Sequence, residues 1–148
     1  TNPNKNNSQN PSNNEEISNS KTQFLRPVKG KIINKYNPNS DKRKDQGIDF
    51  RVLPGSNVYA VSDGSVALVT DNTENFGKIV LIRHENNLIS IYGRVAKVLV
   101  KKNELVKRGQ KIGLMPVKTK DGENFTTLHF ELRKGTKSVN PENYFKDK

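Results

Sequence analysis

The sequence contains no cysteine, and this absence sets the first limits on what the protein does. A chain without cysteine forms no disulfide, builds no thiolate zinc cage and offers no cysteine nucleophile. Long hydrophobic runs are also missing, because no apolar stretch approaches the ~20 residues that a bilayer-spanning helix requires. No transmembrane segment is therefore predicted. The opening residues "TNPNK" carry no signal-peptide pattern, and we expect that an upstream segment has been removed.

Large apolar side chains are scarce at the N-terminus. Residues 1–23 contain one isoleucine, Ile17, and no other large apolar side chain. Such a segment buries too little surface to offset the entropy of its backbone, so we expect a disordered Asn/Ser-rich tail or linker. A polar strand that caps the sheet is the alternative. Residues 24–148 are expected to form one domain with a modest core.

Acidic residues are outnumbered, 15 against 26 basic residues, which gives a formal net charge of +11. The tail is neutral, so the whole excess belongs to residues 24–148. A domain this basic favours anionic partners: nucleic acid, a membrane surface, a cell-wall polymer or an acidic protein face. No basic motif with interleaved aromatic residues is present, so no nucleic-acid partner is predicted. A generally lysine-rich composition is an alternative explanation of the charge.

Short alternating apolar runs, broken by Gly, Asn, Asp and Pro, begin at Phe24. They predict strands at residues 30–36, 47–52, 57–61, 64–70, 77–84, 88–93, 95–100 and 127–133. Turn signals separate them at Pro54-Gly55, Asp63-Gly64, Asn86-Asn87 and Arg108-Gly109. Helical periodicity is nearly absent, and only residues 140–145 are compatible with a turn of helix. Many short strands predict an all-β sandwich or a partly open barrel.

Strand alternation decides which side chains share a face. Within residues 127–133 the even-numbered apolar residues point into a core, and His129 lies on the other, polar face. Within residues 45–50, Asp45 and Asp49 share a face opposite the apolar residues. We therefore expect Asp49 and His129 to project into one polar groove.

Six motifs follow one another between Arg26 and Phe145: "RPVKGKI", "GIDFRVLPGSNVYAVSDGSV", "FGKIVLIRH", "ISIYGR", "VKRGQKIG" and "LHFELRKGTKSVNPENYF". Gly77, in the third motif, is expected where two backbone segments approach closely. The ordered series resembles the lysostaphin/LytM-type zinc metallopeptidase family along its catalytic domain. The resemblance implies a two-sheeted antiparallel β sandwich with an open groove, in agreement with the predicted strands.

The resemblance also implies a zinc site, from which this chain departs. Active members hold zinc through the His and Asp of His-x-Gly-x-Asp and the second His of His-x-His, and two further histidines orient the attacking water. Here Asp45 stands at the first ligand position, whereas Asp49 and His129 keep the other two. Arg94 and Thr127 stand at the catalytic histidines. These are vestigial ligand positions and degenerate catalytic positions, so no catalytic residue is predicted.

The arginine bears directly on metal binding. At an effective dielectric constant near 20, two unit charges ~4 Å apart interact by about 4 kcal/mol, so a guanidinium repels a cation strongly. We expect a contact between Arg94 and Asp49 in which the guanidinium replaces the charge of zinc, and we expect no cofactor. A metal held by Asp45, Asp49 and His129 is the alternative.

The loop at residues 114–125 differs from the glycine-rich turn of active relatives and is longer. It carries Lys118 and Lys120. An ordinary surface insertion and a reshaped groove wall for a protein ligand are both compatible with it. Glu131 and Arg133, beyond this loop, are expected on the same face as His129, and plain charges on the surface of the sheet are the alternative interpretation.

The departures are similar to those of the non-catalytic NlpD-type and EnvC-type regulators of this family. The resemblance implies a pseudoenzyme that activates a periplasmic N-acetylmuramoyl-L-alanine amidase, which splits peptidoglycan during cell division. It implies a location in the periplasm or envelope, with an outer-membrane anchor on a removed N-terminal segment. The implied binding groove consists of Asp45, Asp49, Arg94, Thr127 and His129.

Two other functions are compatible with the same residues. A peptidoglycan-binding pseudoenzyme would recognise the wall without an amidase partner. An active zinc endopeptidase would cut the wall itself, using an aspartate-rich metal site.

Overall fold

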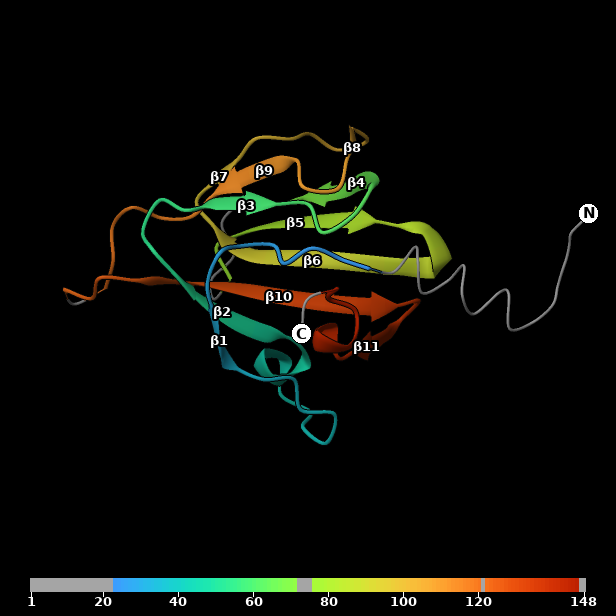
Figure 1. The fold of residues 1–148 in the computed structure, drawn as a ribbon, viewed down its shortest axis with the longest axis horizontal. Coiled ribbons are helices and arrows are strands. Elements are labelled where there is room, and N and C mark those ends of the chain that lie inside the picture. The colour runs from blue at the N-terminus through green and yellow to red at the C-terminus, as the bar shows by residue number, and fades with distance from the viewer. Residues whose placement is uncertain (1–22, 72–75, 121, 147–148) are drawn as a thin grey trace, which may run out of the picture.

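The computed structural model describes residues 23–71, 76–120 and 122–146. Within these ranges the regular structure consists of β-strands and short 3-10 helices, without an α-helix, which confirms the predicted all-β class (Figure 1). No helix in the described ranges is long and apolar enough to cross a membrane. The predicted tail, residues 1–23, lies outside the described residues except for Gln23.

The strands form one large and one small antiparallel sheet. The large sheet has the order β1-β2-β10-β6-β5-β4-β8, and β11 pairs with β10. Its strands are β1 (Lys31–Asn34), β2 (Ile48–Val52), β4 (Gly64–Val69), β5 (Lys78–Arg83), β6 (Leu88–Val95), β8 (Leu105–Val106), β10 (Thr126–Lys134) and β11 (Lys137–Val139). The small sheet has the order β3-β9-β7 and consists of β3 (Asn57–Tyr59), β9 (Lys111–Leu114) and β7 (Lys97–Val98). The described ranges also contain three 3-10 helices: η1 (Arg43–Gln46) and η2 (Glu85–Asn87) lie between strands, and η3 (Pro141–Asn143) follows β11.

The core lies between the two sheets. Leu128, Phe130 and Leu132 of β10 are fully buried on one face, as alternation predicts. The small sheet contributes Val58 and Ile112 to the same apolar cluster. The cluster is continuous across both sheets, so the predicted two-sheeted sandwich is confirmed.

The structure differs from the predicted strands mainly in the second half. β8, β9 and β11 were not predicted, because two to four residues between turns are too few to show alternation. The expected strand at 95–100 is divided, since β6 runs on to Val95 and β7 covers only Lys97–Val98. The helical turn expected within residues 140–145 corresponds to η3.

Two glycines permit the close packing around β10 and β6. A Cβ atom at Gly47 would lie 2.4 Å from the carbonyl oxygen of Phe130, so the entry into β2 accepts no side chain. Gly77 has a φ of +55°, and a Cβ atom there would lie 3.0 Å from the Cα of Arg94. The close approach predicted for Gly77 is therefore confirmed.

Candidate functional site

The site is built on three neighbouring strands, β2, β10 and β6. Asp49 of β2 lies directly opposite His129 of β10 in the strand pairing, and Gly93 of β6 lies opposite His129 on the other side. The side chains of Asp49 and His129 are on the same face of the sheet and are 6% and 2% exposed as residues. The predicted meeting of these two side chains is confirmed, although both are buried rather than open to solvent.

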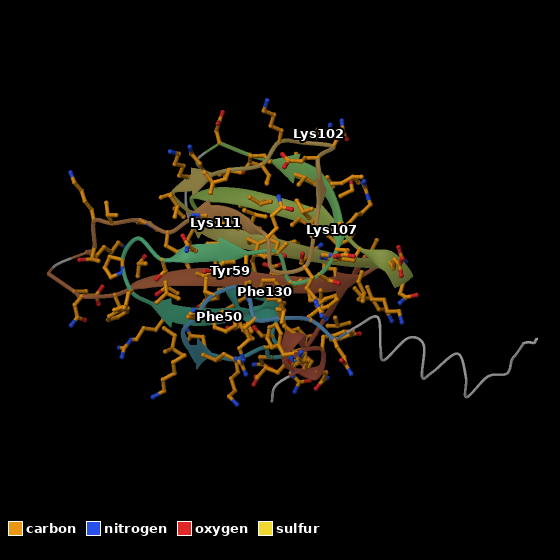
Figure 2. The ribbon with its side chains drawn as sticks, turned by 45° about the horizontal axis from the view of Figure 1, so that its top comes forward. Phe50, Tyr59, Lys102, Lys107, Lys111 and Phe130 are labelled. Atoms are coloured by element: carbon orange, nitrogen blue, oxygen red, sulfur yellow. The ribbon has the colours of Figure 1, made fainter. Side chains whose placement is uncertain are left out.

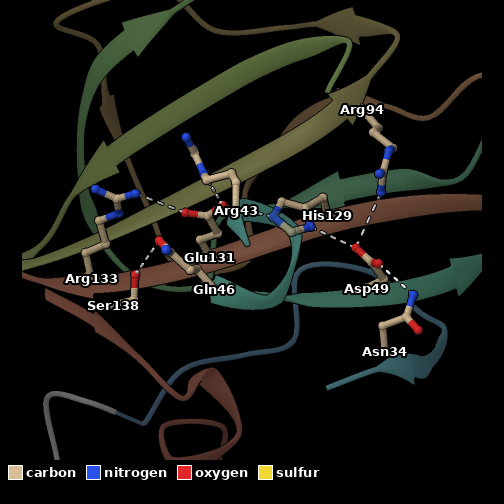
Figure 3. A network of polar contacts seen from close by, with 9 residues as sticks. All are labelled: Asn34, Arg43, Gln46, Asp49, Arg94, His129, Glu131, Arg133 and Ser138. Carbon is tan, nitrogen blue, oxygen red and sulfur yellow. Dashed lines mark hydrogen bonds and ion pairs between the residues drawn. The ribbon is translucent and has the colours of Figure 1, made fainter. Parts of the chain in front are cut away.

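His129 is held by a carboxylate at each ring nitrogen (Figure 3). Its Nδ1 lies 2.8 Å from Oδ1 of Asp49, and its Nε2 lies 2.9 Å from Oε2 of Glu131. Glu131 is two residues along β10, so alternation places its side chain on the same face, and it is fully buried. An imidazolium ring donates to both carboxylates at once, whereas a neutral ring donates to only one.

This arrangement shifts the proton affinities of all three groups. Burial lowers the pKa of His129, but the hydrogen bonds to Asp49 and Glu131 outweigh it and hold the pKa above its usual value. Burial raises the pKa of Glu131, yet His129 and Arg43 bring it down to about 2. Burial likewise raises the pKa of Asp49, and the hydrogen bonds from His129 and Asn34 leave it below its usual value. The carboxylates at both ring nitrogens and the raised pKa of His129 together favour an imidazolium between two carboxylates.

Arginines surround this set. Nη1 of Arg94 lies 3.4 Å from Oδ1 of Asp49, so the contact that the sequence predicts between these residues is present. Nε of Arg43 lies 2.8 Å from Oε2 of Glu131, and Nη2 of Arg133 lies 3.4 Å from its Oε1. Two buried carboxylates carry two negative charges, and an imidazolium balances only one of them. The guanidinium groups supply the remaining positive charge.

The backbone of Arg94 is unusual for a non-glycine residue. Its φ is +67°, in the left-handed region that costs an L-residue roughly 1–3 kcal/mol. A register irregularity between β5 and β6 lies beside it, and its N–H donates to the carbonyl of Phe76. These contacts hold Arg94 in the conformation from which its side chain reaches Asp49.

Phe76 covers the histidine. Its ring centroid lies 4.9 Å from that of His129. The guanidinium carbons of Arg43 and Arg94 lie 5.6 Å and 5.4 Å from the same ring centroid, within cation–π range. The imidazole is thus covered by an aromatic ring and carries a carboxylate at each nitrogen.

A groove of about 750 Å³ opens beside the network. Three of the predicted groove residues line it: Asp49, Arg94 and Thr127. Its wall comes from the loop before β10, including Lys118, Lys120 and Phe125, so this loop forms part of the groove and is not only a surface insertion. The full lining among the described residues is Ile33, Asn34, Asp49, Gly77, Arg94, Val95, Ala96, Pro116, Lys118, Thr119, Lys120, Glu123, Phe125, Thr126 and Thr127. His129, predicted to line the groove, is behind this surface.

Asp45 does not share a strand face with Asp49, and that expectation is wrong. Residues 43–46 form η1 instead of extending β2, so the alternation of a strand does not apply to Asp45. Its backbone carbonyl accepts from Asn37 and its carboxylate accepts from Oγ of Ser40 at 2.7 Å. Asp45 therefore fixes the loop before β2, and it is not among the described residues that line the groove.

These side chains do not fit a metal ion. Both nitrogens of His129 are engaged by carboxylates, so the ring has no free lone pair directed at a shared coordination position. Asp49 is in contact with the Arg94 guanidinium, and Asp45 is bound in its own loop. In the described ranges no cluster of three or more His, Cys, Asp or Glu residues is arranged to hold a metal.

Sequence reasoning missed Glu131, Arg43 and Phe76. The interpretation of Glu131 as a surface charge is wrong, since its side chain is fully buried and ion-paired. Its spacing of two from His129 was the available signal, because that spacing places both side chains on one face. No comparable signal existed for Arg43 and Phe76, which reach the site from segments far away in the sequence.

Known proteins resemble the chain over most of the domain. The family model described as Peptidase family M23 matches residues 43–141. Murein hydrolase activator NlpD of Escherichia coli is 34% identical over 118 residues, which cover 80% of this chain and 30% of that protein. Cell division protein DipM of Caulobacter vibrioides is 29% identical over 117 residues, which cover 79% of this chain and 19% of that protein. The chain thus spans less than a third of either relative.

Solved structures give the same result at the level of the fold. A zinc-containing peptidase from Vibrio cholerae matches with a TM-score of 0.67 and 30% identity, over 80% of this chain and 39% of that one. Lysostaphin matches with a TM-score of 0.64 and 20% identity, over 82% of this chain and 53% of that one. The lysostaphin-like sandwich predicted from the motifs is confirmed.

Proposed function

The chain belongs to peptidase family M23 as an LytM-type domain of the NlpD-type subgroup, and from this premise we propose a non-catalytic regulator of the bacterial envelope. It binds a periplasmic N-acetylmuramoyl-L-alanine amidase through the groove and activates it for the splitting of peptidoglycan. Its relatives support the class, since NlpD is named a murein hydrolase activator and DipM a cell division protein. Lipoprotein relatives such as the NlpD/LppB homologue of Pseudomonas aeruginosa support an envelope location.

The observation that carries the proposal is the closed ion network of His129. A metallopeptidase needs imidazoles with free nitrogens to hold zinc and to activate water. Here the imidazole is bound by Asp49 and Glu131 through both nitrogens. Arg94 and Thr127 occupy the family's catalytic positions and supply no group that would take a proton from water at neutral pH. The domain therefore works without zinc and without hydrolysis of its own.

The open groove suits a helical segment of the amidase. Lys118 and Lys120 give its wall positive charge, and Ile33 and Phe125 add apolar surface. Two further apolar residues are exposed outside the groove lining: Val117, on the same loop, is 75% exposed, and Leu53, directly after β2, is 72% exposed. An amphipathic helix with acidic residues beside its apolar face complements this combination.

Activation requires only a difference in affinity. If the domain binds the open amidase more tightly than the autoinhibited form, binding shifts the population toward the open form. A tenfold difference in affinity changes the ratio of the two forms tenfold, about 1.4 kcal/mol. No residue of this chain has to reach the amidase's own active site.

The test is the affinity between this chain and an amidase from the same organism, measured by titration calorimetry. The variant Lys118→Glu with Lys120→Glu reverses both lysine charges on the groove wall. It is expected to weaken binding at least about tenfold, because the new carboxylates repel an acidic segment. The matched control is Lys134→Glu with Lys137→Glu, which changes the net charge equally on the exposed β10–β11 hairpin and should bind like the parent. Equal weakening by both pairs would contradict a specific groove. Sedimentation of the parent with purified peptidoglycan, without affinity for the amidase, would support the wall-binding alternative instead.

A further inference from the structure

The positive charge of the domain is concentrated beside β8. Residues 97–111 contain six basic residues and one acidic residue. Lys101, Lys102 and Lys107 are exposed. Figure 2 labels Lys102, Lys107 and Lys111, which are exposed, and Phe50 and Phe130, which are fully buried. Nearly half of the net charge of +11 therefore comes from this one segment.

The nearby carboxylates are committed to backbone groups. Oε1 of Glu104 accepts from the backbone N–H of Lys101 at 3.0 Å. Oδ1 of Asp63 accepts from the backbone N–H of Arg108 at 2.8 Å. Within the described ranges, Lys101, Lys102 and Lys107 form no ion pair. Their ammonium groups are available to an external anion.

An exposed leucine lies within this cationic segment. Leu105 of β8 is 79% exposed, the highest value among the large hydrophobic residues that the structure describes. Its neighbour Val106 points inward and is 2% exposed, and Lys107, directly after β8, is exposed like Leu105. Leu99, before this turn in the chain, is 40% exposed, and Leu68, on the neighbouring strand β4, is 42% exposed.

The turn before β8 has a defined conformation. Asn103 has a φ of +75°, which asparagine tolerates better than most residues. The N–H of Glu104 donates to the carbonyl of Lys101, and the N–H of Asn103 donates to the carbonyl of Val66 on β4 at 2.7 Å. The backbone of Lys101 and Lys102 is thus already ordered beside Leu105, so docking does not have to order this turn.

We propose that this segment, the β8 edge (Lys101, Lys102, Leu105, Lys107 and Arg108), docks on an anionic phospholipid bilayer. The cations bind headgroup phosphates, and Leu105 enters the boundary between headgroups and acyl chains. Lysines on an edge strand also discourage strand-to-strand aggregation, but that purpose does not explain a leucine exposed among them. A wall polymer matches the charge yet has no apolar phase for the leucine.

The β8 edge and the groove occupy opposite ends of the large sheet. β8 is the last strand on one side, whereas the strands that line the groove, β1, β2, β10 and β6, are the four on the other side of the strand order. Docking on a bilayer therefore leaves the groove accessible, and the inference does not depend on the proposed amidase partner.

The test is cosedimentation of the 148-residue chain with vesicles, without any amidase. Vesicles of equal parts phosphatidylglycerol and phosphatidylcholine should bind the chain, binding should decrease with added salt, and pure phosphatidylcholine should not bind it. Each lysine near an anionic surface strengthens binding roughly fivefold, so Lys102→Glu with Lys107→Glu should weaken binding more than about tenfold. Leu105→Gln should weaken it about threefold to tenfold, since a side chain this exposed contributes little to folding.

Matched controls separate the β8 edge from net charge and from hydrophobicity in general. Lys134→Glu with Lys137→Glu, and Leu53→Gln, should each bind vesicles like the parent. Equal loss with the Lys134/Lys137 pair would overturn the proposal in favour of unspecific charge. If Leu105→Gln binds the anionic vesicles as tightly as the parent, the proposed insertion of Leu105 into the bilayer is overturned. Binding to purified peptidoglycan but not to vesicles would overturn the lipid and assign a wall polymer.

Discussion

The imidazole of His129 bridges two carboxylates, with Nδ1 2.8 Å from Asp49 and Nε2 2.9 Å from Glu131. Both carboxylates are in turn contacted by arginines, Arg94 on Asp49 and Arg43 on Glu131. Asp49 and His129, which the family resemblance implies as vestigial metal-ligand positions, are therefore joined by direct ion pairing.

The pKa values of the two histidines should be shifted in opposite directions. The carboxylates raise the pKa of His129 above its usual value, whereas burial lowers the pKa of His84. An NMR titration of the two imidazole Cε1–H signals should therefore show His84 losing its proton at lower pH than His129. Asp49→Asn should lower the pKa of His129 and leave that of His84 unchanged. A His129 that titrates below His84 in the parent would contradict the imidazolium assignment.

Stability should fall in acid through Glu131. Its pKa is about 2 in the folded protein, below the ordinary value of 4.5, so its stabilising contribution is present above pH 4.5 and is lost as the pH falls through 4.5 toward 2. The contribution is on the order of a few kcal/mol. Urea unfolding of Glu131→Gln should show a lower stability at pH 7 and a weaker pH dependence in that window. Glu123→Gln, on the exposed loop, should retain the parent's dependence, and a parent with constant stability from pH 5 to pH 2 (roughly) would contradict the network.

Zinc should not bind to the network. A ligand that binds only the folded state raises its stability by mass action, so tight zinc binding would raise the midpoint of thermal unfolding. The account predicts no zinc retained after dialysis and no shift of the unfolding midpoint on adding zinc or chelator. The His129 signals should also be unaffected by zinc. Stoichiometric retention together with a raised midpoint would restore the endopeptidase alternative.

Gly47 should not tolerate a side chain. In Gly47→Ala the new Cβ would lie 2.4 Å from the Phe130 carbonyl oxygen and 2.7 Å from Cγ of Glu131. Overpacking of this kind costs about 1–3 kcal/mol, measurable by urea unfolding. Gly93→Ala is the matched control in the same site, because the nearest atom to its new Cβ would be 3.5 Å away. A Gly47→Ala protein as stable as Gly93→Ala would contradict the packing of β2 against β10.

The fold and part of the site could be predicted from the sequence. Alternation in β10 identified Leu128 and Phe130 as core residues, and the pairing of Asp49 with His129 followed from shared faces and the family motifs. Asp45 was misplaced because a strand pattern was extended through η1, where only local hydrogen bonds decide the conformation.

Burial of charge was harder to predict than strand position. From the sequence alone, Glu131 has the pattern of a surface carboxylate, because its ion-pair partners are not evident there. One of these partners, Arg43, is 88 residues away in the sequence. Phe76 likewise reaches His129 from a turn beside β5. Such contacts depend on the tertiary arrangement, which a periodic pattern in one segment does not contain.

The most direct test of the proposed activator is the release of dye from labelled peptidoglycan by an amidase from the same organism, this chain, and both together. The account predicts release only with both, unaffected when the chain has been treated with chelator and dialysed beforehand. Lys118→Glu with Lys120→Glu should reduce release at limiting concentration, and Lys134→Glu with Lys137→Glu should not. Release by the chain alone, abolished by chelator, would contradict the account and establish a working metal site.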